Sequence, residues 1–148
     1  MKQVQDAYIV AATRTPIGRS HKGSFKHLRP DDLLAHALRA AMAQVPNLDP
    51  KAVEDVIAGC AIPEAQQGLN VARIGAILAG LPNSVGGITV NRFCASGLSA
   101  VAMAADRIRV GEADVMIAAG VESMSMVPMM GNSPSLSPAI FRNTDDIE

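Results

Sequence analysis

The stretch with the clearest potential for chemistry is residues 91–97, which read NRFCASG. It joins an apolar run that predicts a strand to a long run with helical spacing, so Cys94 falls beside the start of a helix. The free N–H groups and the dipole at a helix start stabilise a thiolate, the reactive form of cysteine. Small residues follow, and Gly97 would let another segment approach closely. From chemistry and position alone, a small structural cysteine buried in an apolar layer is the favoured interpretation of Cys94, and a nucleophile is the alternative.

A cysteine nucleophile usually works with a general base, often histidine, and the histidines of this chain are poorly placed for that task. His36 falls on the polar face of a predicted helix, near Asp32 and Arg39, while His21 and His27 lie in a polar, basic stretch. We interpret all three histidines as solvent-exposed side chains. The spacing of the histidines and cysteines does not fit a metal site either, so we expect no metal.

Other polar residues have weaker cases for a direct chemical role. Asn91 and Arg92 come immediately before the candidate nucleophile and are expected to hold its loop in place. Arg14 and Arg73 have the charge to meet a phosphate, but ion pairs on the surface or at an interface are the favoured interpretation for both.

Four apolar runs predict strands, and three runs with helical periodicity predict the helices that connect them. The strands are expected at residues 8–12, 53–60, 87–91 and 114–120, and the helices from Pro30, after the N-cap Asn70, and over residues 95–110. The apolar stripe of the third helix is expected to hold Leu98, Val101, Ala105 and Ile108. Strands that alternate with helices imply a layered α/β fold.

The composition argues against several function classes. The 148 residues carry 13 basic and 14 acidic side chains, so a net charge of -1 gives no overall attraction to nucleic acid or to an anionic membrane. No apolar run reaches the roughly 18 residues that span a bilayer, and the first residues do not form a secretory signal. Two cysteines do not make a disulfide framework, so we expect a cytoplasmic protein.

Three segments, in this order, resemble the thiolase family of acetyl-CoA acetyltransferases and 3-ketoacyl-CoA thiolases. They are IVAATRTPIG at residues 9–18, QQGLNVARIGAILAGLP at 66–82 and VNRFCASGLSAVAMAADRIRVGEADVMIAAGVESMS at 90–125. The resemblance implies a thiolase-like N-terminal half in which a layered mixed sheet carries helices on both faces. It also implies an α/β domain over residues 1–120 and the irregular start of a loop domain, in which the sequence stops, over residues 121–148.

The same resemblance implies a role for Cys94. It would accept an acyl group as a thioester during thiolysis of a 3-ketoacyl-CoA or condensation of acetyl-CoA, in fatty acid metabolism. CoA thioesters would be substrates and not cofactors, and the protein would be a homo-oligomer. Glu122 would belong to a structural turn below the site. The residues that bind CoA stay unassigned.

The second half of the family's proteins supplies a histidine in a Gly-His-Pro motif and a second catalytic cysteine, and neither motif is found here. Cys60 precedes Ala61-Ile62-Pro63 and is interpreted as a buried core residue. We therefore expect the N-terminal part of a thiolase-type acyltransferase, inactive alone, that needs a C-terminal half or a partner chain. Two alternatives stay open: a natural short binding or assembly module, and a ketoacyl synthase-like condensing enzyme.

Overall fold

The computed structural model describes residues 4–139, and within them three strands form one parallel sheet. They are β1 (Asp55–Gly59), β2 (Gly86–Val90) and β3 (Met116–Gly120), in the order β2-β1-β3. Asp55 pairs with Gly86 on one side and with Met116 on the other, so the strands start together and end together. The residues that follow all three strands therefore meet at one edge of the sheet.

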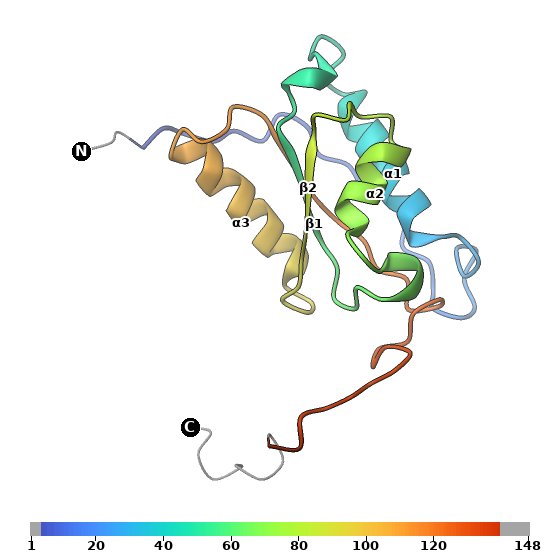
Figure 1. Ribbon diagram of the computed structural model, residues 1–148. Helices are drawn as coiled ribbons and strands as arrows, with labels where there is room; N and C mark the ends of the chain where they lie inside the picture. The colour runs from blue at the N-terminus through green and yellow to red at the C-terminus, as the bar shows by residue number, and fades with distance from the viewer. Residues whose placement is uncertain (1–3, 140–148) are drawn as a thin grey trace.

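Helices cover both faces of this sheet in the described part of the chain (Figure 1). Helices α1 (Pro30–Met42) and α2 (Val71–Leu78) pack against each other on one face, and α3 (Ser96–Arg109) lies on the opposite face. Short 3₁₀ turns at Pro50–Ala52 and Ala65–Gln67 precede and follow β1. The predicted α/β class is confirmed. All pairing seen among residues 4–139 is parallel, so this part of the chain contributes no antiparallel strand to the mixed sheet that was expected.

The predicted N-cap of the second helix is present and also ties that helix to the sheet. The Asn70 side chain accepts a hydrogen bond from the Arg73 N–H at 3.3 Å, which satisfies one free donor of the first turn. Its amide donates to the Gly87 carbonyl at 2.7 Å, and the Thr89 hydroxyl donates to its oxygen at 2.9 Å. One side chain thus fixes the start of α2 against the middle of β2.

The two faces of the sheet are packed with side chains of different size. Between the sheet and the α1–α2 pair lies the larger core, which includes Leu34, Leu38, Val53, Val56, Val71, Leu81 and Val85. On the α3 side the buried residues are Ile57, Ala100 and Ala104. Because two of these three are alanines, α3 can lie close to the strands.

The expected apolar stripe of the third helix is wrong for this reason. The residues of α3 that the sheet buries are Ser96, Ala100 and Ala104. Leu98, by contrast, is 75% exposed, and Val101 is exposed as well. Apolar residues surround much of this helix, so periodicity alone does not select the face that meets the sheet. The small residues make contact because they allow the shorter distance between backbones, and the larger ones point outward.

The strand predicted at residues 8–12 is also wrong, since no strand is assigned there. The side chains of Tyr8, Ile9 and Val10 are 74% to 80% exposed. A strand needs a neighbouring strand for its backbone groups, and here the Ala12 N–H and carbonyl instead bond the Gln44 side chain, each at 3.1 Å. The β-forming residue types are present, but a pairing partner is missing among residues 4–139.

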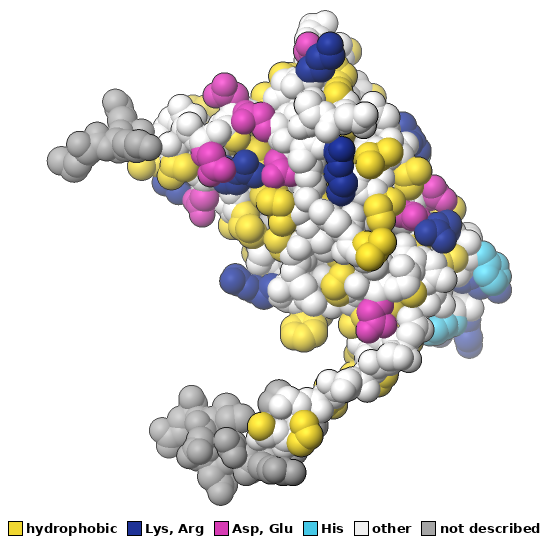
Figure 2. Space-filling view, in the orientation of Figure 1, with side chains coloured by type: hydrophobic (Ala, Val, Ile, Leu, Met, Phe, Trp, Pro, Cys, Tyr) yellow, Lys and Arg dark blue, Asp and Glu magenta, His cyan; other side chains and the backbone are white. Residues whose placement is uncertain are grey.

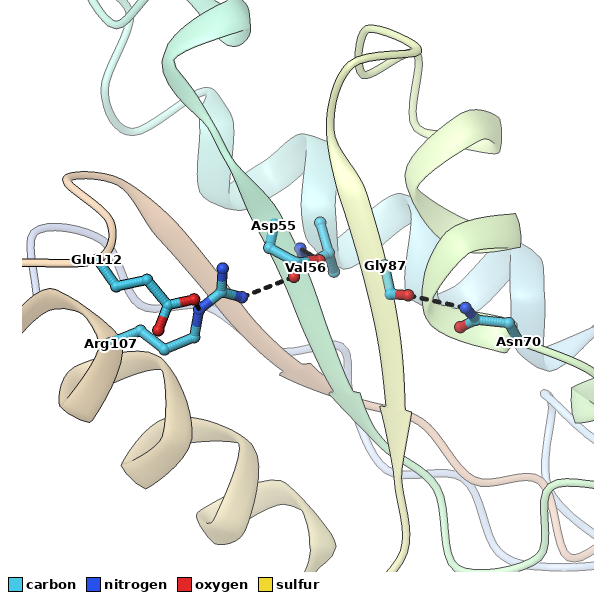
Figure 3. A network of polar contacts seen from close by, with 6 residues as sticks. All are labelled: Asp55, Val56, Asn70, Gly87, Arg107 and Glu112. Carbon is cyan, nitrogen blue, oxygen red and sulfur yellow. Dashed lines mark hydrogen bonds and ion pairs between the residues drawn. The ribbon is translucent and has the colours of Figure 1, made fainter.

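A charged network attaches the far end of α3 to the start of β1 (Figure 3). Asp55 is only 8% exposed, and its carboxylate accepts hydrogen bonds from Arg107 at 2.7 Å and from the Val56 N–H at 2.9 Å. Arg107 also pairs with Glu112 at 2.9 Å. The Asp55 carboxylate raises the pKa of Arg107 above its usual value, because it stabilises the charged guanidinium. The network therefore sets how α3 lies along the sheet.

Within residues 4–139, none of the helices combines the length and the apolar character that a membrane crossing requires.

Candidate active site

Cys94 lies in the connection between β2 and α3, four residues after Val90 and two before Ser96. This connection leaves the sheet at the edge where parallel strands end, the usual position of ligand sites in α/β folds. The thiol is exposed. Its exposure argues against the interpretation of Cys94 as a small residue buried in an apolar layer. A catalytic role for Cys94 stays a prediction, and the geometry around it bears on that role.

The backbone turns sharply just before Cys94. Phe93 has a φ of 46°, in the left-handed region that L-residues seldom adopt and that costs on the order of 1 kcal/mol. Its N–H donates to the Asn91 side chain at 2.8 Å, and its carbonyl accepts from the Ser96 hydroxyl at 2.6 Å. The same hydroxyl oxygen accepts from the Arg92 N–H at 2.8 Å. Asn91 and Ser96 together hold the turn that presents the thiol.

The glycine that permits close packing at this turn is Gly59, not Gly97 as the sequence led us to expect. A Cβ atom on Gly59 would lie 2.4 Å from the backbone carbon of Ser96, which no side chain tolerates. A Cβ atom on Gly97 would meet nothing within 4 Å. The last residue of β1 therefore presses directly on the first turn of α3, while Gly97 faces open space.

A set of hydrogen bonds crosses the sheet edge beneath Cys94 and joins the ends of all three strands. Glu122, after β3, accepts from the Ala61 N–H at 2.7 Å and from the Gln67 side-chain amide. The Ala61 carbonyl in turn accepts from the Asn91 side chain at 2.9 Å, after β2. These contacts agree with the expected structural turn at Glu122 and loop-holding role of Asn91. Nothing in the sequence singled out Gln67, because a glutamine in the polar loop after β1 carries no distinguishing pattern.

Cys60 has the opposite environment from Cys94. It is 1% exposed, and its N–H donates to the Val90 carbonyl at 3.0 Å, so it extends the pairing of β1 with β2. Burial raises the pKa of the Cys60 thiol to about 11, and the negative charge of Glu122 adds to this, against a smaller opposing hydrogen bond with Ile62. The residue is a neutral core thiol, as predicted.

The structure places no histidine at the candidate nucleophile. All three histidines are exposed, and those visible in Figure 2 lie on the side of the molecule away from α3 and the turn before it. Among residues 4–139, moreover, no group of three His, Cys, Asp or Glu side chains is arranged to hold a metal ion. Within residues 4–139, the structure therefore places no histidine where it could serve as the general base of Cys94.

The two arginines proposed for ion pairs bind main-chain carbonyls. The Arg73 guanidinium donates to the carbonyls of Val85 and Asn83, the latter at 3.1 Å, and so fastens the loop between α2 and β2. Arg14 donates to the Thr15 carbonyl at 3.3 Å. The ion-pair expectation is therefore not met by Arg73, whose charge is used to hold a loop.

Comparison with known families supplies a match over nearly the whole chain. The family described as thiolase, N-terminal domain, matches residues 7–145. This chain belongs to the thiolase family. The match contains the turn at Cys94, the polar set at the sheet edge and every strand and helix of the structure.

Similar thiolases are found in several bacteria. A 3-ketoacyl-CoA thiolase of Bacillus subtilis is 49% identical over 129 residues, which are 87% of this chain and 33% of that protein. A 3-ketoacyl-CoA thiolase of Vibrio cholerae is 47% identical over 91% of this chain and 35% of that protein. A 3-oxoadipyl-CoA/3-oxo-5,6-dehydrosuberyl-CoA thiolase of Escherichia coli is 47% identical over 89% of this chain. The chain thus spans about a third of the length of these relatives. Their names weigh against the ketoacyl synthase-like alternative.

Proposed function

We propose that this chain is the catalytic-cysteine part of a thiolase-type acyltransferase, in which Cys94 carries the acyl group. The observation that supports the proposal most directly is an exposed thiol on a strained turn between β2 and α3. At the start of α3, the Ala95 and Ser96 N–H groups donate to the Arg92 and Phe93 carbonyls, each at 3.0 Å, and so hold the turn that presents the thiol. The names of the relatives support 3-ketoacyl-CoA as the proposed substrate class.

In the proposed thiolysis, the Cys94 thiolate attacks the keto carbon of a 3-ketoacyl-CoA. The bond between the second and third acyl carbons breaks, its electron pair stays on the second carbon, and a proton from a general acid completes acetyl-CoA. The shortened acyl group remains on Cys94 as a thioester. A second CoA then loses its thiol proton, attacks the thioester carbonyl and releases acyl-CoA with the Cys94 thiolate restored. Condensation of acetyl-CoA follows the reverse path from acetyl-Cys94.

In the proposed mechanism, groups outside this segment transfer the protons. Residues 4–139 hold no histidine near Cys94, so the described part of the chain provides a nucleophile without its base. We expect acyl transfer to need the remaining length of the protein or a partner chain. The chain by itself should not turn over acetoacetyl-CoA.

A partner for this segment is supported by its exposed apolar side chains. Phe93 is 71% exposed and Leu98 is 75% exposed, beside the candidate nucleophile, and Val101 continues this surface along α3. Exposed apolar area of this kind commonly marks an interface. We propose that it is covered in the working protein by the rest of the chain or by another copy. A monomer in gel filtration of the 148-residue chain would contradict pairing of this segment alone.

The proposed reaction also sets a requirement on the compartment. Acyl transfer needs Cys94 as a free thiol, and both cysteines are free in the structure. A reducing compartment such as the cytoplasm meets this requirement. Cell fractionation followed by immunodetection of this segment would test the assignment.

The decisive experiment is to trap the acyl-enzyme. The intact protein is incubated with acetyl-CoA, digested, and the Cys94 peptide is weighed. We expect an added acetyl group on that peptide, none on the Cys60 peptide, and loss of both the adduct and thiolase activity in Cys94→Ala. Acylation elsewhere, or full activity of Cys94→Ala, would refute the proposal.

A further inference from the structure

Glu122 occupies a position that only an acceptor can fill. One carboxylate oxygen accepts from the Ala61 N–H at 2.7 Å, and the other accepts from the Gln67 side-chain amide. Two donors therefore point at one side chain. A carboxylate offers an acceptor oxygen to each, whereas the amide of glutamine would have to turn its own NH₂ toward one of them.

Gln67 cannot rotate to relieve such a mismatch, because both ends of its amide are already used. The side chain is fully buried. Its nitrogen also donates to the Ile62 carbonyl at 2.8 Å, and its oxygen accepts from the Ser123 N–H at 3.0 Å. The orientation of the amide is set by these two backbone groups, so its N–H faces Glu122 whatever residue stands at position 122.

From Glu122 the contacts lead without a break to the nucleophile. The Ala61 residue is held on one side by Glu122, and its carbonyl on the other side accepts from Asn91 at 2.9 Å. The Asn91 oxygen accepts from the Phe93 N–H at 2.8 Å, and Phe93, in the left-handed conformation, immediately precedes Cys94. Each link restrains the next, because every donor and acceptor in the series has a defined partner.

We propose that Glu122, oriented by Gln67, is a positioning residue that sets the geometry of Cys94 through Ala61 and Asn91. The inference rests on the proposed function for its catalytic meaning, since it assigns Glu122 to the placement of the acyl-accepting thiol. This role is more than that of a structural turn, because the two carboxylate oxygens of Glu122 hold the backbone segments that position Cys94. Glu122 itself takes no part in proton transfer.

The test compares two glutamates in the intact protein. Glu122→Gln keeps the size of the side chain but sets a donor against a donor. Glu64→Gln is the matched control, because within residues 4–139 Glu64 accepts from one backbone group, the Asn132 N–H at 2.6 Å, and an amide oxygen can keep that bond. Both variants lose one negative charge in the same part of the fold. The rate of acetyl-Cys94 formation from acetyl-CoA is measured by the mass of the Cys94 peptide.

We expect Glu122→Gln to slow acyl-enzyme formation about tenfold at saturating acetyl-CoA, with its apparent affinity unchanged, since small displacements of a reacting group are costly. Glu64→Gln should stay within about twofold of the unchanged protein. Asn91→Ala should also slow the reaction, and adding Glu122→Gln to it should cost little more, because both act through one series of contacts. A Glu122→Gln rate within about twofold, or full additivity with Asn91→Ala, would overturn the proposal.

Protection of Cys60 separates positioning from folding. Cys60 should resist iodoacetamide in every folded variant, because it is 1% exposed. If Glu122→Gln exposes Cys60, Gln67→Met replaces it in the test. A slowing of more than about twofold but less than about tenfold is then expected, because Glu122 loses the donor that orients it and keeps its bond to Ala61. If the unchanged protein forms no acetyl-Cys94, the proposed function fails. The positioning role is then judged by Cys94 alkylation, where equal rates in Glu122→Gln and Glu64→Gln would refute it.

Discussion

The two cysteines of this chain follow neighbouring parallel strands at the same edge of the sheet, yet they have opposite environments. Cys60 directly follows the central strand β1 and continues its pairing, whereas Cys94 comes after the edge strand β2 and beyond a left-handed turn. The difference lies in what holds the backbone after the strand ends. A residue that stays in the hydrogen-bond ladder is buried by the layers above and below, and one that leaves the ladder by a turn is presented to solvent.

The largest expected difference between the two cysteines is in their rate of alkylation. At pH 8, iodoacetamide should modify Cys94 at least a hundredfold faster than Cys60, since only about one in a thousand Cys60 thiols is ionised when its pKa is about 11, and burial blocks access. Peptide mass spectrometry over time measures both rates in one sample. In urea the two rates should converge, and a large difference that persists there would contradict an origin in the fold.

A second comparison uses the two glycines near the turn. Gly59→Ala would place a Cβ atom 2.4 Å from the Ser96 backbone and should lower the free energy of unfolding by about 3 kcal/mol. In Gly97→Ala the new Cβ atom meets no neighbour within 4 Å. Because alanine favours a helix more than glycine does, this variant should raise the free energy of unfolding by about 0.5 kcal/mol. Urea denaturation of both variants measures the changes. Equal effects would show that the contact between β1 and α3 is looser than the structure has it.

The buried thiol also predicts a dependence of stability on pH. The pKa of Cys60 is raised from 9.0 to about 11 in the folded state, so the unfolded chain loses this proton first as pH rises. The Cys60 thiol makes its full contribution to the free energy of unfolding below about pH 9. This contribution falls by roughly 2 kcal/mol as the pH approaches about 11. Cys60→Ala should flatten this part of the profile relative to the unchanged chain. Cys94→Ala serves as the control, and an unaltered slope in Cys60→Ala would refute the prediction.

The smallest expected effect concerns the turn itself. Ser96→Ala removes a hydroxyl that bonds both the Arg92 N–H and the Phe93 carbonyl, and it should lower the free energy of unfolding by about 1.5 kcal/mol. Ser99→Ala, one turn further along α3, should have less effect. Thermal unfolding of the two variants provides the measurement. A larger loss in Ser99→Ala would mean that Ser96 does not hold the turn.

Local sequence signals were sufficient where the chemistry that forms an element lies within that element. Pro30 at a helix start and the Asn70 cap predicted where the first two helices begin. The apolar runs at 53–60, 87–91 and 114–120 predicted three strands, whose bounds lie within two residues of those observed. The position of Cys94 likewise followed from local order, because a strand that leads into a helix must place the residue between them at the sheet edge. The prediction that Cys94 is a nucleophile came from the resemblance to the thiolases.

What the sequence determined by itself was the set of elements, their order and the position of one cysteine between a strand and a helix. Tertiary structure decided which side of α3 meets the sheet, why Gly59 is a glycine, and that the side chains of Glu122 and Gln67 are hydrogen-bonded to each other. It also left residues 8–12 without the neighbour that a strand requires. The physical reason is the same in each case: periodicity and capping are properties of one segment, whereas close approach, pairing and a shared hydrogen bond depend on a second segment far away in the chain.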